Sequence, residues 1–574
     1  MLAVRLNQIT IRNFRNFAHV VVPLGPGTVI VGENRAGKSN LLHAVRLVLD
    51  PTLPNSEREL RPEDFWDGLS DGSPNWNPMM EGEVIEISVD IDDFESEPSV
   101  VTALSDALIE GEPMRARLTY RWSPRDLGTD SATTRPLYDW VIVGGYGREG
   151  RVPRDMRQYL FVTYLHALRD VEDDLRSWRR SPLRQLLQAA SEVIKQDELD
   201  KIGQAIKEAN EKVGDLEAIR DLGGRIAQRT FELVGEFHGL EAELGVAPPD
   251  TLRLIRGLRV FVDGAAHRDL GSASLGTLNV LYLALLELGL EQQLRDRLIA
   301  HVILAVDEPE AHLHPHLQRL IFRRLLWEAD REQTTIVTTQ SPHVASVAPP
   351  RSLVVLQRRD DRVEAVAANA ADLNSTEWED IGRYLDATRA ELVFARRIVF
   401  VEGFAEQVLL PALAGSRDLD ALGITICAIH GVHFSTYVRL AQALRIRWAV
   451  VTDGDPDSNG RAGDRRAGRL MNRLGISGSA PDHGIFVGRS TFEMDLFEAS
   501  DDNKDAIKRV LSELATSDAV RESVSNWAAV PPAQNDLIGA IAKVGGKGRV
   551  AQRLSIERLD APSYIAAAFD YLAE

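Results

Sequence analysis

The feature that most constrains the fold is an eight-residue glycine loop between a predicted strand and a predicted helix. Thr28–Val31 is a short apolar run typical of a buried strand. The loop, Gly32–Ser39, fits the pattern G-x-x-x-x-G-K-[ST], and an apolar-periodic segment continues from about Lys38 to Leu49 before Pro51. A strand, a glycine loop and a helix in this order predict an α/β domain that binds a nucleoside triphosphate.

Each residue type in the loop has a chemical reason to be there. Backbone N–H groups surround the phosphates at the positive end of the helix, Lys38 reaches the terminal phosphates, and the Ser39 hydroxyl binds Mg²⁺. A second apolar strand, Ile303–Val306, delivers two carboxylates to its end. We expect Asp307 to hold Mg²⁺ and Glu308 to orient the attacking water. A chance loop and a simple helix cap are the alternatives, and the two motifs together argue against both.

Composition excludes several classes of protein. The chain has 574 residues, of which 44% are hydrophobic and 26% charged, so it is neither disordered nor fibrous and should form several domains. We find no run of 18 apolar residues and no apolar leader, and Cys427 is the single cysteine. We therefore expect a cytoplasmic protein without a membrane span, an internal disulfide or a multi-cysteine zinc site.

The charge balance restricts how the chain can meet nucleic acid. The formal net charge is −19, whereas binding by a uniformly basic surface depends on lysine and arginine displacing counterions from phosphates. Any DNA contact must therefore be local or bridged by metal ions.

Two more apolar segments end in carboxylates. Val399–Val401 precedes Glu402, and Glu406 follows four residues later, about one helical turn away. After a later strand, Asp453 and Asp455 are two residues apart and can project the same way. Converging carboxylates repel one another, and Mg²⁺ or Mn²⁺ relieves that repulsion. Two such ions roughly 4 Å apart can activate water against a phosphodiester, whereas either half alone is usually a solvated helix face or a turn.

Other segments resemble the ATPase heads of the ABC, SMC and RecF-like class. They are the small-residue turn at 270–277, residues 7–17 and the run at 307–315. The resemblance implies that Ser274 and Gly276 of one protomer complete the nucleotide site of another, and hence a homodimer or a dimer of dimers. It also places a histidine at position 340, where this chain has Gln340. This departure concerns the γ-phosphate contact and the rate of ATP hydrolysis.

The carboxylates after the later strands resemble a Toprim domain. Residues 161–170, 491–497 and 546–549 extend the resemblance to the OLD (overcoming lysogenization defect) nucleases, which fuse a RecF-like ATPase to a C-terminal Toprim domain. The resemblance implies that Glu493 assists the metal site. It also implies that Lys547 neutralises charge on the cleaved phosphate, and Lys543 is a rival for that role.

The resemblance predicts an α/β chain in which an ABC-type ATPase head is interrupted by a helical dimerisation arm and followed by a Toprim domain with a Rossmann-like parallel sheet. The predicted domains are the N-terminal ATPase part with Walker A at 1–170, the arm at 171–248, the C-terminal ATPase part with the signature loop and Walker B at 249–370, a linker at 371–395 and the Toprim domain at 396–574.

The predicted function is that of an ATP-binding, nucleotide-controlled, divalent-metal-dependent DNA endonuclease in defence against phage or other foreign DNA, with an operon-encoded partner left open. The cofactors are ATP with Mg²⁺, and Mg²⁺ or Mn²⁺ in a two-metal Toprim site. The predicted catalytic residues are Glu402, Asp453, Asp455, Lys547 and Glu308. The predicted nucleotide-binding residues are Asn34, Gly37, Lys38, Ser39, Asn40, Asp307, Ser274, Gly276 and Gln340. The predicted metal ligands are Glu402, Glu406, Asp453, Asp455, Glu493, Ser39 and Asp307.

Two other functions compete with the nuclease. One is a DNA-repair or structural ATPase with a non-catalytic Toprim module, which the four intact carboxylates disfavour. The other is a topoisomerase or primase. The single cysteine removes the usual zinc-binding primase partner, and the remaining length leaves no room for a DNA-gate domain.

Two further clusters stay open. Arg176, Arg179, Arg180 and Arg184 accompany Trp178 and predict either phosphate contact or a solvated helix face. His312, His314 and His316 could bind a transition metal, but their place just after the Asp307–Glu308 pair favours contacts between protomers.

Overall fold

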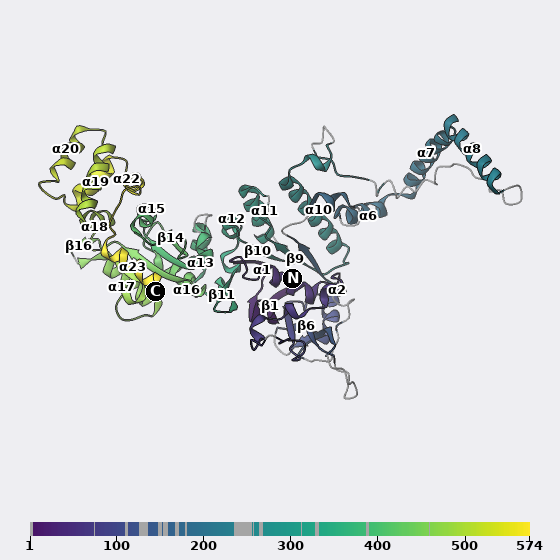
Figure 1. Cartoon of the computed structure of the whole chain (residues 1–574), viewed down its shortest axis with the longest axis horizontal. Helices are drawn as coiled ribbons and strands as arrows, with labels where there is room; N and C mark the ends of the chain where they lie inside the picture. Colours follow the sequence, from purple (N-terminus) through teal and green to yellow (C-terminus); the bar gives the residue numbers. More distant parts are fainter. Residues whose placement is uncertain are drawn as a thin grey trace. The chain divides into compact units, whose positions relative to one another are not determined.

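A computed structural model describes residues 4–73, 75–109, 113–125, 136–146, 152, 159–166, 171–177, 181–234, 255, 258–262, 268–311, 313–327, 332–385, 390–458 and 460–574. The chain divides into two compact units, Met1–Ala167 with Ala300–Glu574, and Leu168–Ile299. The first unit contains a head with two sheets and a C-terminal domain with a third sheet (Figure 1).

The first sheet of the head is antiparallel. Its strands, in order, are β2 (Phe17–Pro23), β1 (Arg5–Phe14), β4 (Ile85–Asp92), β6 (Arg115–Pro124) and β5 (Leu108–Ile109), and β7 (Tyr138–Gly144) also pairs with β6. Burial alternates along most of β6 and in the first half of β4, because successive side chains of a strand point to opposite faces.

The second sheet of the head carries the glycine loop. Its order is β12 (Arg362–Ala367), β11 (Leu353–Arg359), β3 (Gly27–Gly32), β10 (Gln333–Thr339), β9 (His301–Asp307) and β8 (Leu160–Leu165). All neighbours are parallel except β11 and β12. Strands β3 and β9 are buried at every residue, as expected for parallel strands covered on both faces.

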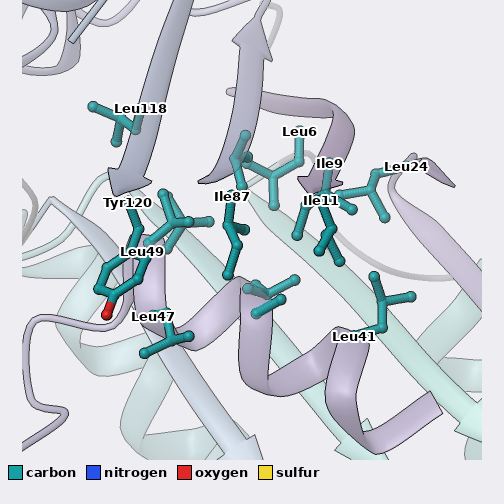
Figure 2. Close-up of a cluster of buried hydrophobic side chains, with 14 of the residues drawn as sticks. Leu6, Ile9, Ile11, Leu24, Leu41, Leu47, Leu49, Ile87, Leu118 and Tyr120 are labelled. Atoms are coloured by element: carbon teal, nitrogen blue, oxygen red, sulfur yellow. The ribbon is translucent and has the colours of Figure 1, made fainter. Parts of the chain in front are cut away.

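Helix α1 (Lys38–Leu49) lies between these two sheets. It contacts β4 and β6 on one side and β8 and β9 on the other. Figure 2 shows Leu41, Leu47 and Leu49 of α1 among side chains of the antiparallel sheet, such as Ile87 and Tyr120. This core holds the helix start, and with it the glycine loop, against the ends of β3 and β9. The other head helices are α2 (Asn55–Arg58), α3 (Pro98–Ala103), α11 (Pro315–Trp327), α12 (Pro342–Val347) and α13 (Ser375–Tyr384).

The C-terminal domain is built on a four-stranded parallel sheet. Its order is β14 (Ile424–Ala428), β13 (Arg397–Val401), β15 (Arg447–Thr452) and β18 (Ile485–Val487). A short hairpin, β16 (Pro456–Asp457) and β17 (Gly460–Arg461), follows β15. The helices are α15 (Phe404–Leu413), α16 (Phe434–Ala443), α17 (Ala462–Leu474), α18 (Phe492–Glu498), α19 (Asp501–Leu514), α20 (Asp518–Asn526), α21 (Gln534–Lys543), α22 (Lys547–Leu554) and α23 (Ser563–Ala573).

The second unit is helical. It contains α5 (Val171–Arg176), α6 (Leu183–Val193), α7 (Gln196–Gly214), α8 (Glu217–Val234) and α10 (Leu275–Arg295). Helices α7 and α8 form a hairpin in Figure 1, and its apolar side chains Ile202, Leu222 and Phe231 are exposed. None of the described helices in either unit combines the length and the apolar character needed to cross a membrane.

The mixed α/β fold class is confirmed, and the predicted helix from Lys38 to Leu49 has those bounds in the structure. The predicted linker at 371–395 contains α13 and the 3₁₀ helix Glu391–Phe394. Helix α13 begins with a capping box between Asn374 and Glu377. The predicted arm at 171–248 contains α5, α6, α7 and α8, the last of which ends at Val234, and residues 178–180 and 235–248 lie outside the described residues.

Candidate functional site

The glycine loop has the backbone that phosphate binding requires. It connects β3 to α1, and Gly37 has a φ of 89°, a left-handed conformation that a side chain would strain. A Cβ at Gly37 would also collide with the Asn16 side chain. Asn16 in turn accepts a 2.8 Å hydrogen bond from Nδ2 of Asn40, whose Oδ1 accepts from Arg15. The predicted residue Asn34 is exposed on the loop.

Lys38 is buried beneath this loop. Its Nζ donates to the carbonyl oxygens of Gly32 and Glu33, at 2.9 Å and 3.2 Å, and lies 3.6 Å from a carboxylate oxygen of Glu308. The ammonium group is therefore held at the loop, where the terminal phosphates of a nucleotide would bind.

Asp307, at the end of β9, meets Ser39 at the start of α1. Ser39 Oγ donates to Asp307 Oδ1 at 3.1 Å, so the predicted hydroxyl and carboxylate ligands of Mg²⁺ lie side by side. Thr338 donates to the same oxygen at 2.6 Å, and the Tyr164 hydroxyl lies 3.2 Å from Oδ2. Burial raises the pKa of Tyr164, which therefore remains a protonated donor. These residues fit a nucleotide–Mg²⁺ complex.

Gln340 contacts the second carboxylate of the head. Its Nε2 donates to Glu308 Oε1, so the amide is positioned to hold the carboxylate predicted to orient water. Gln340 is itself held by Glu310, which accepts from the Gln340 backbone N–H at 2.7 Å and from the Thr339 hydroxyl at 2.9 Å. Burial raises the pKa of Glu310. Gln340 thus has a contact of its own where the resemblance expected a histidine.

Ser274 and Gly276 lie in the second unit. Ser274 is the N-cap of α10 and accepts from the Thr277 N–H at 3.2 Å, while Gly276 is in the first turn. Their predicted action on the nucleotide of another protomer stays a prediction.

In the C-terminal domain, the predicted carboxylates converge at the ends of two neighbouring strands. Glu402 follows β13 and Asp453 follows β15, and these strands are paired in parallel. Carboxylate oxygens of Glu402, Asp453 and Asp455 lie within 4.8 Å of one another. Gly454, between the two aspartates, is required sterically, because a Cβ there would collide with the carbonyl oxygen of Gly488.

Glu406, Glu493 and Lys547 complete this acidic cluster. Glu406 is on α15 and Glu493 on α18, and both are buried. Lys547, the first residue of α22, has its Nζ 2.9 Å from Glu493 Oε1. Burial lowers the pKa of Lys547, but the Glu493 carboxylate more than offsets this, so the net shift is upward. The rival Lys543 is exposed at the end of α21.

The acidic cluster carries more negative charge than its surroundings neutralise. Burial raises the pKa of Asp453 to about 9, and the charges of Glu402 and Glu406 add to the effect. Burial likewise raises the pKa of Glu406 to about 7, with Glu493 and Glu402 contributing. Carboxylates held together in this state fit hard divalent cations, which prefer oxygen ligands.

Arg466 on α17 is a site residue that the sequence reasoning missed. Its guanidinium donates to Glu402 Oε1 at 3.1 Å, to Asp455 Oδ2 at 2.9 Å and to the Asp453 carbonyl oxygen at 2.6 Å. Its Nε also contacts the Thr452 hydroxyl, which donates to Glu402. Arg466 therefore fixes one oxygen of each of two predicted ligands. Nothing local distinguishes it from the neighbouring arginines of α17.

Tyr164, Thr338 and Glu310 were also not assigned, although Tyr164 and Glu310 lie in segments that carried the resemblance and Thr338 is two residues before Gln340. The structure adds little about the arginine and histidine clusters that the sequence left open. Arg176 pairs with Glu172 and Asp269, and residues 178–180 lie outside the described part of the chain. The rings of His314 and His316 stack on each other, while His312 also lies outside it.

Comparisons with known proteins agree with this two-site architecture. A family profile described as "Overcoming lysogenization defect protein-like, TOPRIM domain" matches residues 393–455. A profile described as "AAA domain, putative AbiEii toxin, Type IV TA system" matches residues 28–346, more than half of the chain.

Individual relatives extend over most of the chain. The OLD nuclease of Thermus scotoductus is 28% identical over 471 residues, which cover 78% of this chain and 82% of that protein. Endonuclease GajA of Bacillus cereus is 22% identical over 468 residues, which cover 79% and 75%. The solved C-terminal region of the Burkholderia pseudomallei OLD protein is 35% identical and covers 31% of this chain and 97% of that one, with a TM-score of 0.29. The two profile matches, together with the similarity to the OLD nuclease of Thermus scotoductus, assign this chain to the OLD family, with an AAA-type ATPase domain followed by an OLD-like Toprim domain.

Proposed function

We propose that the protein is an ATP-binding, nucleotide-controlled, divalent-metal-dependent DNA endonuclease. The observation that carries this proposal is the convergence of Glu402, Asp453 and Asp455 at the ends of two paired parallel strands. The relatives named OLD nuclease and Endonuclease GajA support the same activity.

The residues of the acidic cluster divide the work of hydrolysis. Bound Mg²⁺ or Mn²⁺ would supply activation of water and charge neutralisation at the phosphate. Glu402, Asp453 and Asp455 would hold the ions, and buried Glu406 and Glu493 would extend the ligand set. Lys547 is half-exposed beside Glu493, so its ammonium can face the extra negative charge that develops on the phosphate during cleavage.

The decisive experiment removes one ligand charge at a time. Glu402→Gln and Asp453→Asn should abolish Mg²⁺- or Mn²⁺-dependent cleavage of DNA while ATPase activity persists, because Asp307 and Glu308 belong to a separate site. Glu498→Gln is the matched control, since Glu498 is an exposed carboxylate on α18. Wild-type cleavage by Asp453→Asn, with contaminating nuclease excluded, would instead favour a repair or structural ATPase with a non-catalytic Toprim module.

Nucleotide control has a candidate physical link. Glu33, in the glycine loop, pairs with Arg396, next to the start of β13, and Arg396 Nη2 lies 2.8 Å from Glu33 Oε2. The Arg396 guanidinium lowers the pKa of Glu33. Gln357 of the head also donates to the Leu444 carbonyl oxygen of the Toprim domain at 2.8 Å. Exposed ion pairs contribute little stability. The relevance of the Glu33–Arg396 pair is that it connects the glycine loop to the Toprim domain.

This link can be tested directly. Arg396→Gln should retain cleavage and ATP binding but reduce the change in cleavage rate that ATP produces. Arg383→Gln, which removes an exposed pair within α13, is the control. An unchanged ATP response in Arg396→Gln would eliminate this route of control.

Assembly and biological role complete the proposal. Because Ser274 and Gly276 are proposed to act on another protomer, we expect a homodimer or a dimer of dimers in the cytoplasm. Light scattering that gives only the 63.6 kDa monomer, with and without ATP, would contradict this. A role in antiphage defence, alone or with an operon-encoded partner, predicts that cells expressing the wild type resist phage better than cells expressing Asp453→Asn.

A further inference from the structure

Helix α17 presents a row of arginines beside the acidic cluster. The helix begins at Ala462, seven residues after Asp455 in the sequence, and its only acidic residue is Asp464. Arg465, Arg469 and Arg473 are spaced four residues apart, so they lie along one face, and all three are exposed. We call these three residues the arginine stripe. The buried residues of the helix are Gly463, Ala467, Leu470 and Met471.

The arginine stripe has a fixed position relative to the acidic cluster. Arg466, the next residue after Arg465, is largely buried and donates to Glu402 and Asp455. Leu470 and Met471 hold the helix by its apolar side, and α17 contacts α16 and β18. The exposed arginines therefore belong to the same helix that contacts the acidic cluster through Arg466.

Two of the three arginines in the stripe have no carboxylate partner among the residues that the structure describes. Arg465 pairs with Asp457. Arg473 donates to the Ser435 hydroxyl at 2.8 Å, and within the described part of the chain neither Arg469 nor Arg473 forms an ion pair with a carboxylate. By contrast, Arg417, Arg509 and Arg521 of the same domain each pair with a carboxylate. In a chain of net charge −19, positive charge left unpaired at this place suits an anionic ligand.

We infer that the arginine stripe binds the phosphate backbone of DNA and leads one strand to the acidic cluster. This inference rests on the proposed nuclease function and names the surface that holds its substrate. The helical rise of 1.5 Å per residue separates successive stripe residues by about 6 Å along the axis, so each can reach a different phosphate of an extended strand. Guanidinium groups match phosphate oxygens in geometry as well as charge.

The test measures how DNA affinity depends on salt. Binding of a short fluorescent duplex is followed by anisotropy in EDTA, which prevents cleavage, over a series of NaCl concentrations. Removal of one arginine–phosphate interaction lowers the slope of log K against log[salt] by about 0.9, so Arg469→Gln with Arg473→Gln should lower it by about 1.8. The double variant Arg469→Lys with Arg473→Lys keeps both charges and should retain most of the slope.

Arg521→Gln is the matched control. It removes the same charge from α20, which Figure 1 draws well apart from α17 within the same domain. An unchanged slope in the glutamine double variant, or an equal decrease per charge in Arg521→Gln, would overturn the inference. If the wild type cuts DNA while the double variant keeps its slope, only the stripe fails. If the wild type neither binds nor cuts DNA, the nuclease proposal fails as well.

Discussion

The two acidic sites of the first unit occupy equivalent places but have different electrostatic surroundings. Both lie where parallel strands end, at β9 in the head and at β13 and β15 in the Toprim domain. In the head, Asp307 accepts hydrogen bonds from Ser39 and Thr338, and Glu308 lies near Lys38. In the Toprim domain, Arg466 and Lys547 contact the acidic cluster, but its five carboxylates outnumber these two cations.

This difference indicates what each site needs from a ligand. The head already supplies donors and an ammonium group, so it is suited to an anion that carries its own Mg²⁺. The acidic cluster has an excess of negative charge, which burial makes costly and which divalent cations would relieve. Both sites have carboxylates at strand ends, but their neighbouring residues differ. One site is therefore suited to a nucleotide with its Mg²⁺, and the other to divalent cations alone.

The largest expected effect is on ATP binding at the head, and it should leave metal binding at the acidic cluster unchanged. Lys38→Ala should weaken ATP binding by about 100-fold, because the variant has no ammonium group to form a charge-assisted hydrogen bond with the phosphates. Mn²⁺ binding at the acidic cluster should not change. Calorimetry with ATP and with Mn²⁺ measures both, and Lys543→Ala, which removes an exposed lysine, serves as the control. Unchanged ATP affinity in Lys38→Ala would refute the assignment of the head site.

Arg466 tests whether the Toprim site depends on protein donors as the head site does. Arg466→Gln should weaken Mn²⁺ binding by roughly 10- to 100-fold, as is typical when a group that orients metal ligands is removed. Electron paramagnetic resonance of free Mn²⁺ gives the affinity. Arg469→Gln, on the next turn of α17, should bind Mn²⁺ normally. Tighter binding in Arg466→Gln would mean that Arg466 competes with the ion and does not orient its ligands.

Substitution of Gln340 tests whether its hydrogen bond to Glu308 contributes to ATP hydrolysis. Gln340→Ala should slow ATP hydrolysis by about tenfold, the equivalent of removing one hydrogen bond that orients Glu308. ATP affinity should change little, so the effect should appear in kcat. Gln340→His should retain most of the rate, since an imidazole N–H can also donate to the carboxylate. A larger effect on ATP affinity than on kcat would assign Gln340 to binding.

The smallest effect concerns stability without metal. The pKa of Asp453, raised to about 9, means that the folded protein loses stability as pH increases from the ordinary aspartate range towards 9. Asp453→Asn should therefore raise the melting temperature in EDTA at pH 8 by about 2–4 °C, the shift that corresponds to roughly 1 kcal/mol in a domain of this size. Mg²⁺ should stabilise the wild type more than the variant. Glu498→Gln should show neither change, and a lower melting temperature for Asp453→Asn would contradict the argument.

The motif residues could be predicted because their signals are local. The glycine loop, Asp307, Glu402 and Asp453 each follow a short apolar strand, and parallel strands bring their ends to one edge. Helix α13 was missed because its surroundings are polar. Its amphipathic pattern and the capping box at Asn374 were available signals.

The sequence by itself determined the α/β class and the placement of carboxylates at the strand ends of both candidate sites, because strand periodicity and loop chemistry depend on neighbouring residues. Only the tertiary structure decided which distant side chains support those sites. Tyr164 reaches Asp307 across 143 residues of sequence, and Arg466 reaches Glu402 across 64. The position of Lys547 beside Glu493 likewise depends on how α22 packs against α15 and α19. Such contacts arise from the packing of whole elements, and no local pattern in the chain encodes them.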